Sequence, residues 1–112
     1  MGVVTAGPRR GDVYLISLDP TRGSESRKTR PCVVVSPDEL NPYLGTFMVA
    51  PMTTGGRSYA FRVPCRFREK DGYVVADQLR TVDEVRLVRR LGRLSPATMT
   101  EVLEVLQRMF AP

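Results

Sequence analysis

The sequence contains no histidine and no tryptophan, and it has only two cysteines, Cys32 and Cys65. Without histidine the chain cannot form a Ser-His or Cys-His nucleophile, or an acid–base pair built on imidazole. A metal centre held by histidine and cysteine ligands is excluded for the same reason. Each cysteine lies beside a proline in a strand-like run, which favours a reduced, buried side chain over a disulfide.

Long apolar segments are also missing. No run approaches the roughly 18 residues that a membrane-spanning helix needs, and residues 1–10 lack the apolar centre of a signal peptide. We therefore expect a cytoplasmic protein that makes no contact with membranes. The length of 112 residues predicts a single domain over residues 11–112, preceded by a flexible N-terminal arm over residues 1–10.

Basic residues are abundant, and nearly all of them are arginine. Seventeen basic residues face twelve acidic ones, giving a net charge of +5, and all but two of the basic residues are arginine. Arginine holds two phosphate oxygens at once through its planar guanidinium, which lysine cannot do. The composition indicates a site for a polyanion, and the alternative is a basic surface that only contacts solvent.

Short runs of branched and aromatic residues predict a mainly β domain. We expect strands at residues 13–18, 31–36, 46–50, 59–63 and 73–79, with shorter strands near Val82 and over residues 88–94. Pro51 should close the third strand, and Asp71-Gly72 should form the turn before the fifth. The run at residues 31–36 is apolar on both faces, so it should be central and buried.

One helix is predicted near the C-terminus. Ser95 suits the N-cap position and Pro96 the first helical position. Apolar residues then recur at helical spacing: Met99, Val102, Leu103, Leu106 and Phe110. Several short strands followed by one helix predict a small antiparallel barrel with the helix packed on it.

The remaining residue types suit phosphodiester transfer within RNA, because the 2′-hydroxyl of the substrate is the nucleophile. Arg30 begins a strand and Pro31 holds its backbone extended, while Thr53 follows a strand end. Glu25, in a charged loop, and Asp77, in an apolar run, are the candidate carboxylates. From these positions alone, Arg30 could equally brace the loop, Thr53 could bond a turn amide, and Asp77 could bond the backbone.

Taken together, six segments in this order are specific. They are Gly-Asp-Val-Tyr at 11–14, Leu-Asp-Pro-Thr-Arg-Gly-Ser-Glu at 18–25, Thr-Arg-Pro-Cys-Val-Val-Val-Ser at 29–36, Val-Ala-Pro-Met-Thr-Thr at 49–54, Ala-Asp-Gln-Leu-Arg-Thr-Val-Asp at 76–83 and Leu-Gly-Arg-Leu-Ser at 91–95. The chain resembles the MazF/PemK family of type II toxin–antitoxin endoribonucleases from Gly11 through the C-terminal helix.

The resemblance implies an SH3-like antiparallel barrel with a terminal helix that forms a homodimer. It also implies a toxin that cuts single-stranded mRNA at particular sequences without a metal or other cofactor, leaving 2′,3′-cyclic phosphate and 5′-hydroxyl ends. A cognate MazE-like antitoxin would be its partner.

By the same resemblance, Arg30 and Thr53 match the catalytic pair of the family. Glu25 matches an acidic loop residue near the RNA, and Asp77 and Gln78 match a segment that borders the site. Two further arginines, Arg57 and Arg80, are candidate RNA contacts.

Two departures from the family pattern select a branch. The PemK-like branch carries an arginine where this chain has Val75, and a histidine where it has Ser24. The resemblance therefore implies the Arg-Thr scheme of the MazF-like branch for this chain.

Two alternatives belong to other functional classes. A gyrase poison on the related barrel uses a C-terminal tryptophan that this chain lacks, and a non-catalytic binding barrel would not need Arg30 and Thr53.

Overall fold

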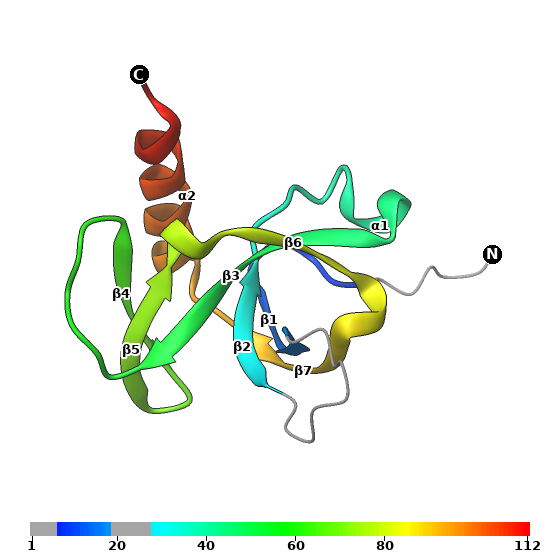
Figure 1. The fold of residues 1–112 in the computed structure, drawn as a ribbon, viewed down its shortest axis with the longest axis horizontal. Helices are drawn as coiled ribbons and strands as arrows, with labels where there is room; N and C mark the ends of the chain where they lie inside the picture. The colour runs from blue at the N-terminus through cyan, green and yellow to red at the C-terminus, as the bar shows by residue number, and fades with distance from the viewer. Residues whose placement is uncertain (1–6, 19–27) are drawn as a thin grey trace.

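A strongly curved antiparallel sheet of seven strands is formed within residues 7–18 and 28–112, which are the residues that the computed structural model describes (Figure 1). The strands are β1 (Asp12–Ser17), β2 (Thr29–Val34), β3 (Thr46–Thr54), β4 (Arg62–Phe67), β5 (Lys70–Val75), β6 (Arg80–Asp83) and β7 (Leu87–Arg93). Their order is β4-β5-β3-β2-β1-β7, and β6 pairs with the first part of β3. The short helices α1 (Asn41–Leu44), η1 (Ala76–Gln78) and η2 (Glu84–Arg86) connect strands, and the long helix α2 (Pro96–Phe110) follows β7.

Strand β2 is buried on both faces, as its apolar sequence predicts. Cys32, Val33 and Val34 are fully buried. Because successive side chains point to opposite faces of a sheet, Val33 joins one core and its two neighbours join another. The first core lies under α2 and contains Val13, Val33, Val35, Ala50, Met52, Val63, Val74, Ala76, Leu94, Met99, Val102 and Val105. The second lies on the other face and contains Ile16, Cys32, Val34, Phe47, Val49 and Val82.

The N-terminus of α2 confirms the predicted cap. The Ser95 hydroxyl accepts a hydrogen bond from the backbone N–H of Thr98 at 3.2 Å. Pro96 occupies the first helical position, where its missing N–H has no helical partner to lose. The helix therefore starts at the residue that the sequence indicates.

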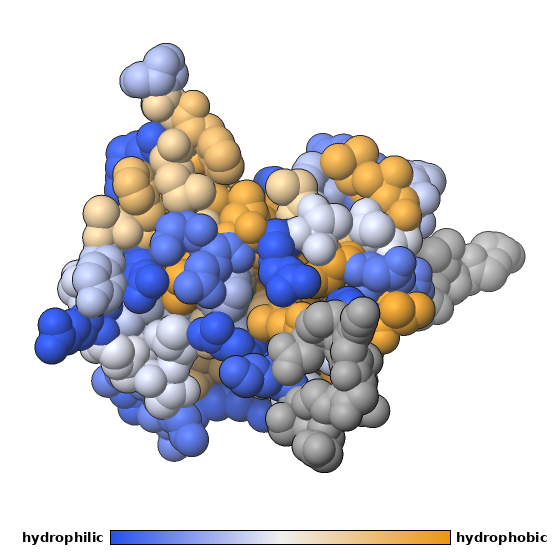
Figure 2. Space-filling model, in the orientation of Figure 1, coloured by the Kyte–Doolittle hydropathy of each residue, from blue (hydrophilic) through white to orange (hydrophobic). Residues whose placement is uncertain are grey.

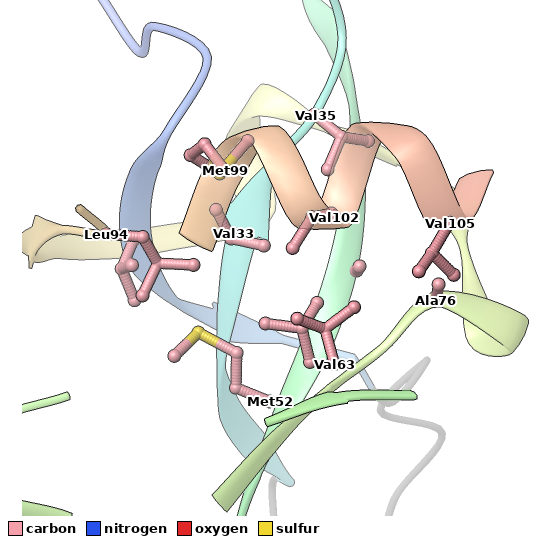
Figure 3. Close-up of a cluster of buried hydrophobic side chains, with 12 residues drawn as sticks. Val33, Val35, Met52, Val63, Ala76, Leu94, Met99, Val102 and Val105 are labelled. Carbon is pink, nitrogen blue, oxygen red and sulfur yellow. The ribbon is translucent and has the colours of Figure 1, made fainter. Parts of the chain in front are cut away.

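The apolar stripe of α2 packs on the sheet for most of its length. Met99, Val102 and Val105 are buried and point toward the strands (Figure 3). Phe110 is 70% exposed, so its assignment to the core stripe is wrong. The last turn of α2 projects beyond the edge of the sheet (Figure 1).

Strand β3 is longer than predicted, because Pro51 does not end it. One edge of β3 pairs with β6 over Thr46–Val49 and with β5 over Met52–Thr54. Pro51 falls in the gap between those two partners. A residue without a backbone N–H is tolerated at that position.

The β4–β5 hairpin is displaced from its predicted position. Its turn lies at Arg68 and Glu69, whose φ angles of 52° and 65° suit a two-residue hairpin connection. The predicted turn at Asp71-Gly72 is wrong, because Gly72 lies inside β5. The predicted fifth strand is correct only as far as Val75, because the chain then bends through η1 to continue as β6 along the same edge of β3.

The sheet is curved like a barrel but is not closed by hydrogen bonds. Among the described residues, β4 and β7 at the two ends of the strand order do not pair with each other. A side chain spans part of the gap, since the Arg68 guanidinium donates to the Leu91 carbonyl at 2.8 Å. The fold class is the expected one, with an open seam between β4 and β7.

A buried carboxylate fixes β7 to β1. Asp12 is only 4% exposed, and its side chain accepts hydrogen bonds from Arg93 at 2.8 Å, from Arg90 at 3.2 Å and from the backbone N–H of Arg9 at 2.9 Å. The carboxylate is buried, whereas the side chains of Arg90 and Arg93 are each 49% exposed. Two of the arginines on β7 therefore have a structural role, and the predicted division between residues 1–10 and 11–112 stays a prediction.

Candidate active site

The register between β2 and β3 determines which side chains meet at one end of the sheet. The two strands pair Cys32 with Pro51, Val33 with Ala50 and Val34 with Val49. The pairing ends at Cys32 and Pro51, and Arg30 and Thr53 each lie two residues beyond that last pair. By alternation along each strand, both positions share the face of Cys32, which is the face of the sheet away from α2. The two residues that the sequence predicts as a catalytic pair thus lie on adjacent strands, at the end where β2 and β3 leave their pairing.

A second arginine lies near Arg30. Burial raises the pKa of the Cys32 thiol to about 12, and the positive charges of Arg30 and Arg80 oppose that rise. Both guanidinium groups therefore lie within electrostatic reach of one buried sulfur atom. Neither has a hydrogen bond or ion pair to another residue of the described segments. The predicted contact Arg80 belongs to the same region as Arg30.

The Thr53 hydroxyl is already engaged by the backbone. It donates to the Gly55 carbonyl at 3.2 Å and accepts from the Tyr73 N–H at 3.2 Å. These bonds hold the start of the β3–β4 loop and strand β5 together. The simpler interpretation of Thr53, as a residue that bonds a turn, describes its contacts in this structure. A ligand would have to replace the Gly55 carbonyl as the acceptor.

Gly72 allows β5 to approach Thr53 closely. A Cβ atom at Gly72 would overlap the carbonyl group of Thr53, so no other residue fits without moving one strand. This close packing explains why glycine occurs inside β5 rather than in a turn. It is a residue of the site that the sequence analysis missed, because Asp-Gly is also typical of hairpin turns.

Asp77 and Gln78 are not brought together with Arg30 and Thr53. Both are exposed on η1, beyond the end of β5, so the expectation that Asp77 lies within an apolar strand is wrong. The Asp77 carboxylate forms an ion pair with Arg62 at 3.3 Å. The Arg62 guanidinium in turn lies 4.7 Å from the centre of the Tyr59 ring. Asp77 therefore holds the Arg62 guanidinium in place, and Arg62 contacts Tyr59 in the loop before β4.

One of the two remaining predicted contacts lies on a loop. Arg57 is exposed in the connection between β3 and β4. Glu25 lies outside the described residues. Figure 2 shows apolar residues gathered along α2 and over α1, whereas hydrophilic residues cover the region of β4 and β5.

Two findings bear on cofactors and membranes. In the described part of the chain, no three His, Cys, Asp or Glu side chains lie close enough to hold a metal ion. Of the helices in that part, none is long and apolar enough to cross a membrane.

Comparison with known proteins identifies the family. Residues 9–110 match the family described as PemK-like, MazF-like toxin of type II toxin–antitoxin system. An endoribonuclease solved in complex with its cognate antitoxin from a Mycobacterial species is 27% identical, with a TM-score of 0.79 over 95% of this chain and 98% of that one. MazF from Deinococcus radiodurans is 26% identical, with a TM-score of 0.78 over 94% and 97%. A MazE–MazF structure from the same organism is 27% identical, with a TM-score of 0.79 over 91% and 94%. The chain belongs to the PemK-like, MazF-like family of type II toxins.

Proposed function

We propose that this toxin is an endoribonuclease that cuts single-stranded mRNA by attack of the 2′-hydroxyl on the adjacent phosphate. The products are a 2′,3′-cyclic phosphate and a 5′-hydroxyl, and no metal ion or other cofactor takes part. The observation that carries this proposal is that Arg30 and Thr53 lie on adjacent strands, each two residues beyond the last pair of β2 with β3, and that the charges of Arg30 and Arg80 both act on Cys32. Both the RNA and the antitoxin would be met in the cytoplasm.

Arg30 is suited to hold the scissile phosphate. Its guanidinium donates from two nitrogens in one plane, so it binds two phosphate oxygens and stabilises the charge that builds on them during attack. It is a poor general base, because a guanidinium carries only hydrogen-bond donors and no acceptor. Pro31 fixes the strand backbone immediately after it, so the cation is aimed from a rigid element.

Thr53 would bind the same phosphate through its hydroxyl. The hydroxyl proton now goes to the Gly55 carbonyl, and a phosphate oxygen is a stronger acceptor for it. The Tyr73 N–H would keep the oxygen of Thr53 in place during that exchange. Thr53 therefore contacts the reacting group without a change in strand pairing.

The other predicted residues act along the path of the RNA strand. Arg80 and Arg57 supply positive charge for neighbouring phosphates. Asp77 acts through Arg62, with which it forms an ion pair, and Gln78 lies exposed beside it. Glu25, which lies outside the described residues, is proposed to contact the RNA as well.

The reaction is tested by removing the nucleophile. A strand with 2′-deoxyribose at the cut site should bind and remain intact, while the unmodified strand is cut at the same rate in the presence of a chelator. The measurement is electrophoresis of end-labelled RNA, with mass spectrometry of the new ends. Cutting of the deoxy-substituted position, or loss of cutting with the chelator, would contradict the mechanism.

The role of Arg30 is tested by Arg30→Ala. We expect a folded protein whose cutting rate falls by about a hundredfold or more, since preorganised donors at the reacting charge contribute about 3 kcal/mol or more. Arg30→Lys should recover little of that loss, because a point charge does not replace the planar fork. The matched control is Arg108→Ala, at an exposed arginine of α2. If the two alanine variants cut equally well, Arg30 has no part in the reaction.

A second copy of the chain is proposed to dock beside α2. A cavity of about 450 Å³ there is lined by apolar side chains of α2 and neighbouring segments, among them Met48, Leu79, Leu103, Leu106 and Phe110. Phe110 is 70% exposed, and Figure 2 shows the apolar surface along α2. A homodimer would cover this surface and add to the small core of a 112-residue chain.

Phe110→Arg should shift the protein from dimer to monomer, because it introduces a charge into the buried face of the pair. Sedimentation equilibrium would measure the change. Tyr43→Arg is the control, since Tyr43 is 79% exposed on α1, away from this cavity. A Phe110 variant that stays as dimeric as its control would exclude this interface.

The cognate partner is proposed to be a MazE-like antitoxin. The structure of the Deinococcus radiodurans relative contains MazE with MazF, and this chain has a net charge of +5. An acidic segment with apolar anchors would suit that surface and would cover the Arg30 region. Titrating such a peptide into a complex with uncut RNA should release the RNA, and a stable ternary complex would rule out a shared site.

A further inference from the structure

A depression lies over β4 and β5, next to the loop that follows Thr53. Its volume is about 430 Å³, and the residues around it include Gly55, Gly56, Arg66, Asp71 and Tyr73. Thr98, near the start of α2, also contributes to its lining. This depression is separate from the apolar cavity beside α2.

Strand register places Tyr73 in line with the candidate active site. Tyr73 pairs directly with Thr53, and its backbone N–H donates to the Thr53 hydroxyl at 3.2 Å. Arg30 lies on the strand on the other side of β3, beyond the last pair of β2 with β3. Neighbouring paired strands are about 4.8 Å apart, so Tyr73 lies about 5 Å from Thr53 across the sheet.

The Tyr73 ring is not used by either core. The ring is half-buried and belongs to neither apolar cluster, whereas its neighbour Val74 is fully buried on the other face. The phenol hydroxyl makes no hydrogen bond to any residue in the described parts of the chain. Gly56 lies beside both the ring and the Thr53 hydroxyl, because a Cβ atom on it would be 3.9 Å from Cδ2 of Tyr73 and 3.7 Å from Oγ1 of Thr53.

A polar pair lies next to the ring. Arg66 and Asp71 face each other across β4 and β5 and form an ion pair at 3.0 Å, with side chains 63% and 79% exposed. An exposed pair of this kind contributes little to stability. Its carboxylate can accept from an N–H group, and its guanidinium can donate to a carbonyl or ring nitrogen. These are the groups on the edge of a nucleobase.

We propose that this depression binds a nucleobase of the RNA, one nucleotide away from the phosphate held by Arg30 and Thr53. The base stacks on the Tyr73 ring, and Arg66 and Asp71 bind its edge. The inference rests on the proposed ribonuclease activity and adds a residue that determines which sequence is cut. An apolar anchor of a protein partner fits less well, because it would remove water from Arg66 and Asp71 without replacing their hydrogen bonds.

The test uses an uncut RNA strand with 2′-deoxyribose at the mapped cut site and the fluorescent base 2-aminopurine beside it. Binding to the wild-type protein should quench the fluorescence by stacking. Tyr73→Phe should keep the quenching, because it keeps the ring. Tyr73→Val should abolish the quenching and weaken RNA binding by about 5- to 100-fold, the loss expected for one stacked base. Tyr43→Val, at an exposed tyrosine on α1, should leave both unchanged.

Asp71→Asn separates base reading from a structural role. It replaces an acceptor with a group that also donates, so the preferred base next to the cut should change while the uncut strand still binds. The proposal is overturned if wild-type protein cuts RNA but shows no quenching on either side of the cut, or if the Tyr73→Val and Tyr43→Val variants bind RNA equally well. Failure of the wild-type protein to cut any RNA would instead refute the proposed function. Single-stranded RNA with 2-aminopurine at successive positions would then test the depression by itself, through quenching that Tyr73→Val abolishes.

Discussion

The register of β2 against β3 is the constraint on which the candidate site depends. A slip of one residue would exchange the two faces of β2 and move Val33 out of the core under α2. Since both faces of β2 are buried, that exchange would disrupt two apolar clusters at once. The same pairing therefore fixes where β2 and β3 separate, and Arg30 and Thr53 lie two residues beyond that point. The proposed chemistry lies at the end of a strand whose middle tolerates little change.

The arginines of this chain have different roles that composition alone does not separate. Arg90 and Arg93 hold the buried Asp12, and Arg62 holds Asp77. Arg30 and Arg80 have no such carboxylate partner among the described residues. A net charge of +5 indicates a polyanion, but only the fold shows which cations remain available for phosphate.

Elements with a strong local signal could be predicted from the sequence. Ser95 and Pro96 suit the first positions of a helix, and the apolar run of β2 needs to be buried. Both features are found where the sequence predicts them. The errors come from features set by distant partners. Pro51 is tolerated within β3 because the strand changes partners there, and no local pattern reports that change.

The candidate site was predictable only in part for the same reason. Arg30 and Thr53 stand out through the resemblance, and the strand pairing gives them a shared position. Tyr73 carries no signal in the sequence, because an aromatic residue in a β-strand is usually part of a core. Its place beside Thr53 follows from the pairing of β3 with β5, and the glycine before it makes that pairing possible.

A double-mutant cycle between Arg30→Ala and Thr53→Val tests the central claim most directly, with the cutting rate of one defined RNA as the readout. Thr53→Ser serves as the control, because it retains the hydroxyl that bonds Gly55 and Tyr73. If both residues hold one phosphate, the double variant should lose far less activity than the product of the two single losses, because residues that act as a unit are not additive. Losses that multiply would show that Arg30 and Thr53 act independently and would contradict the account.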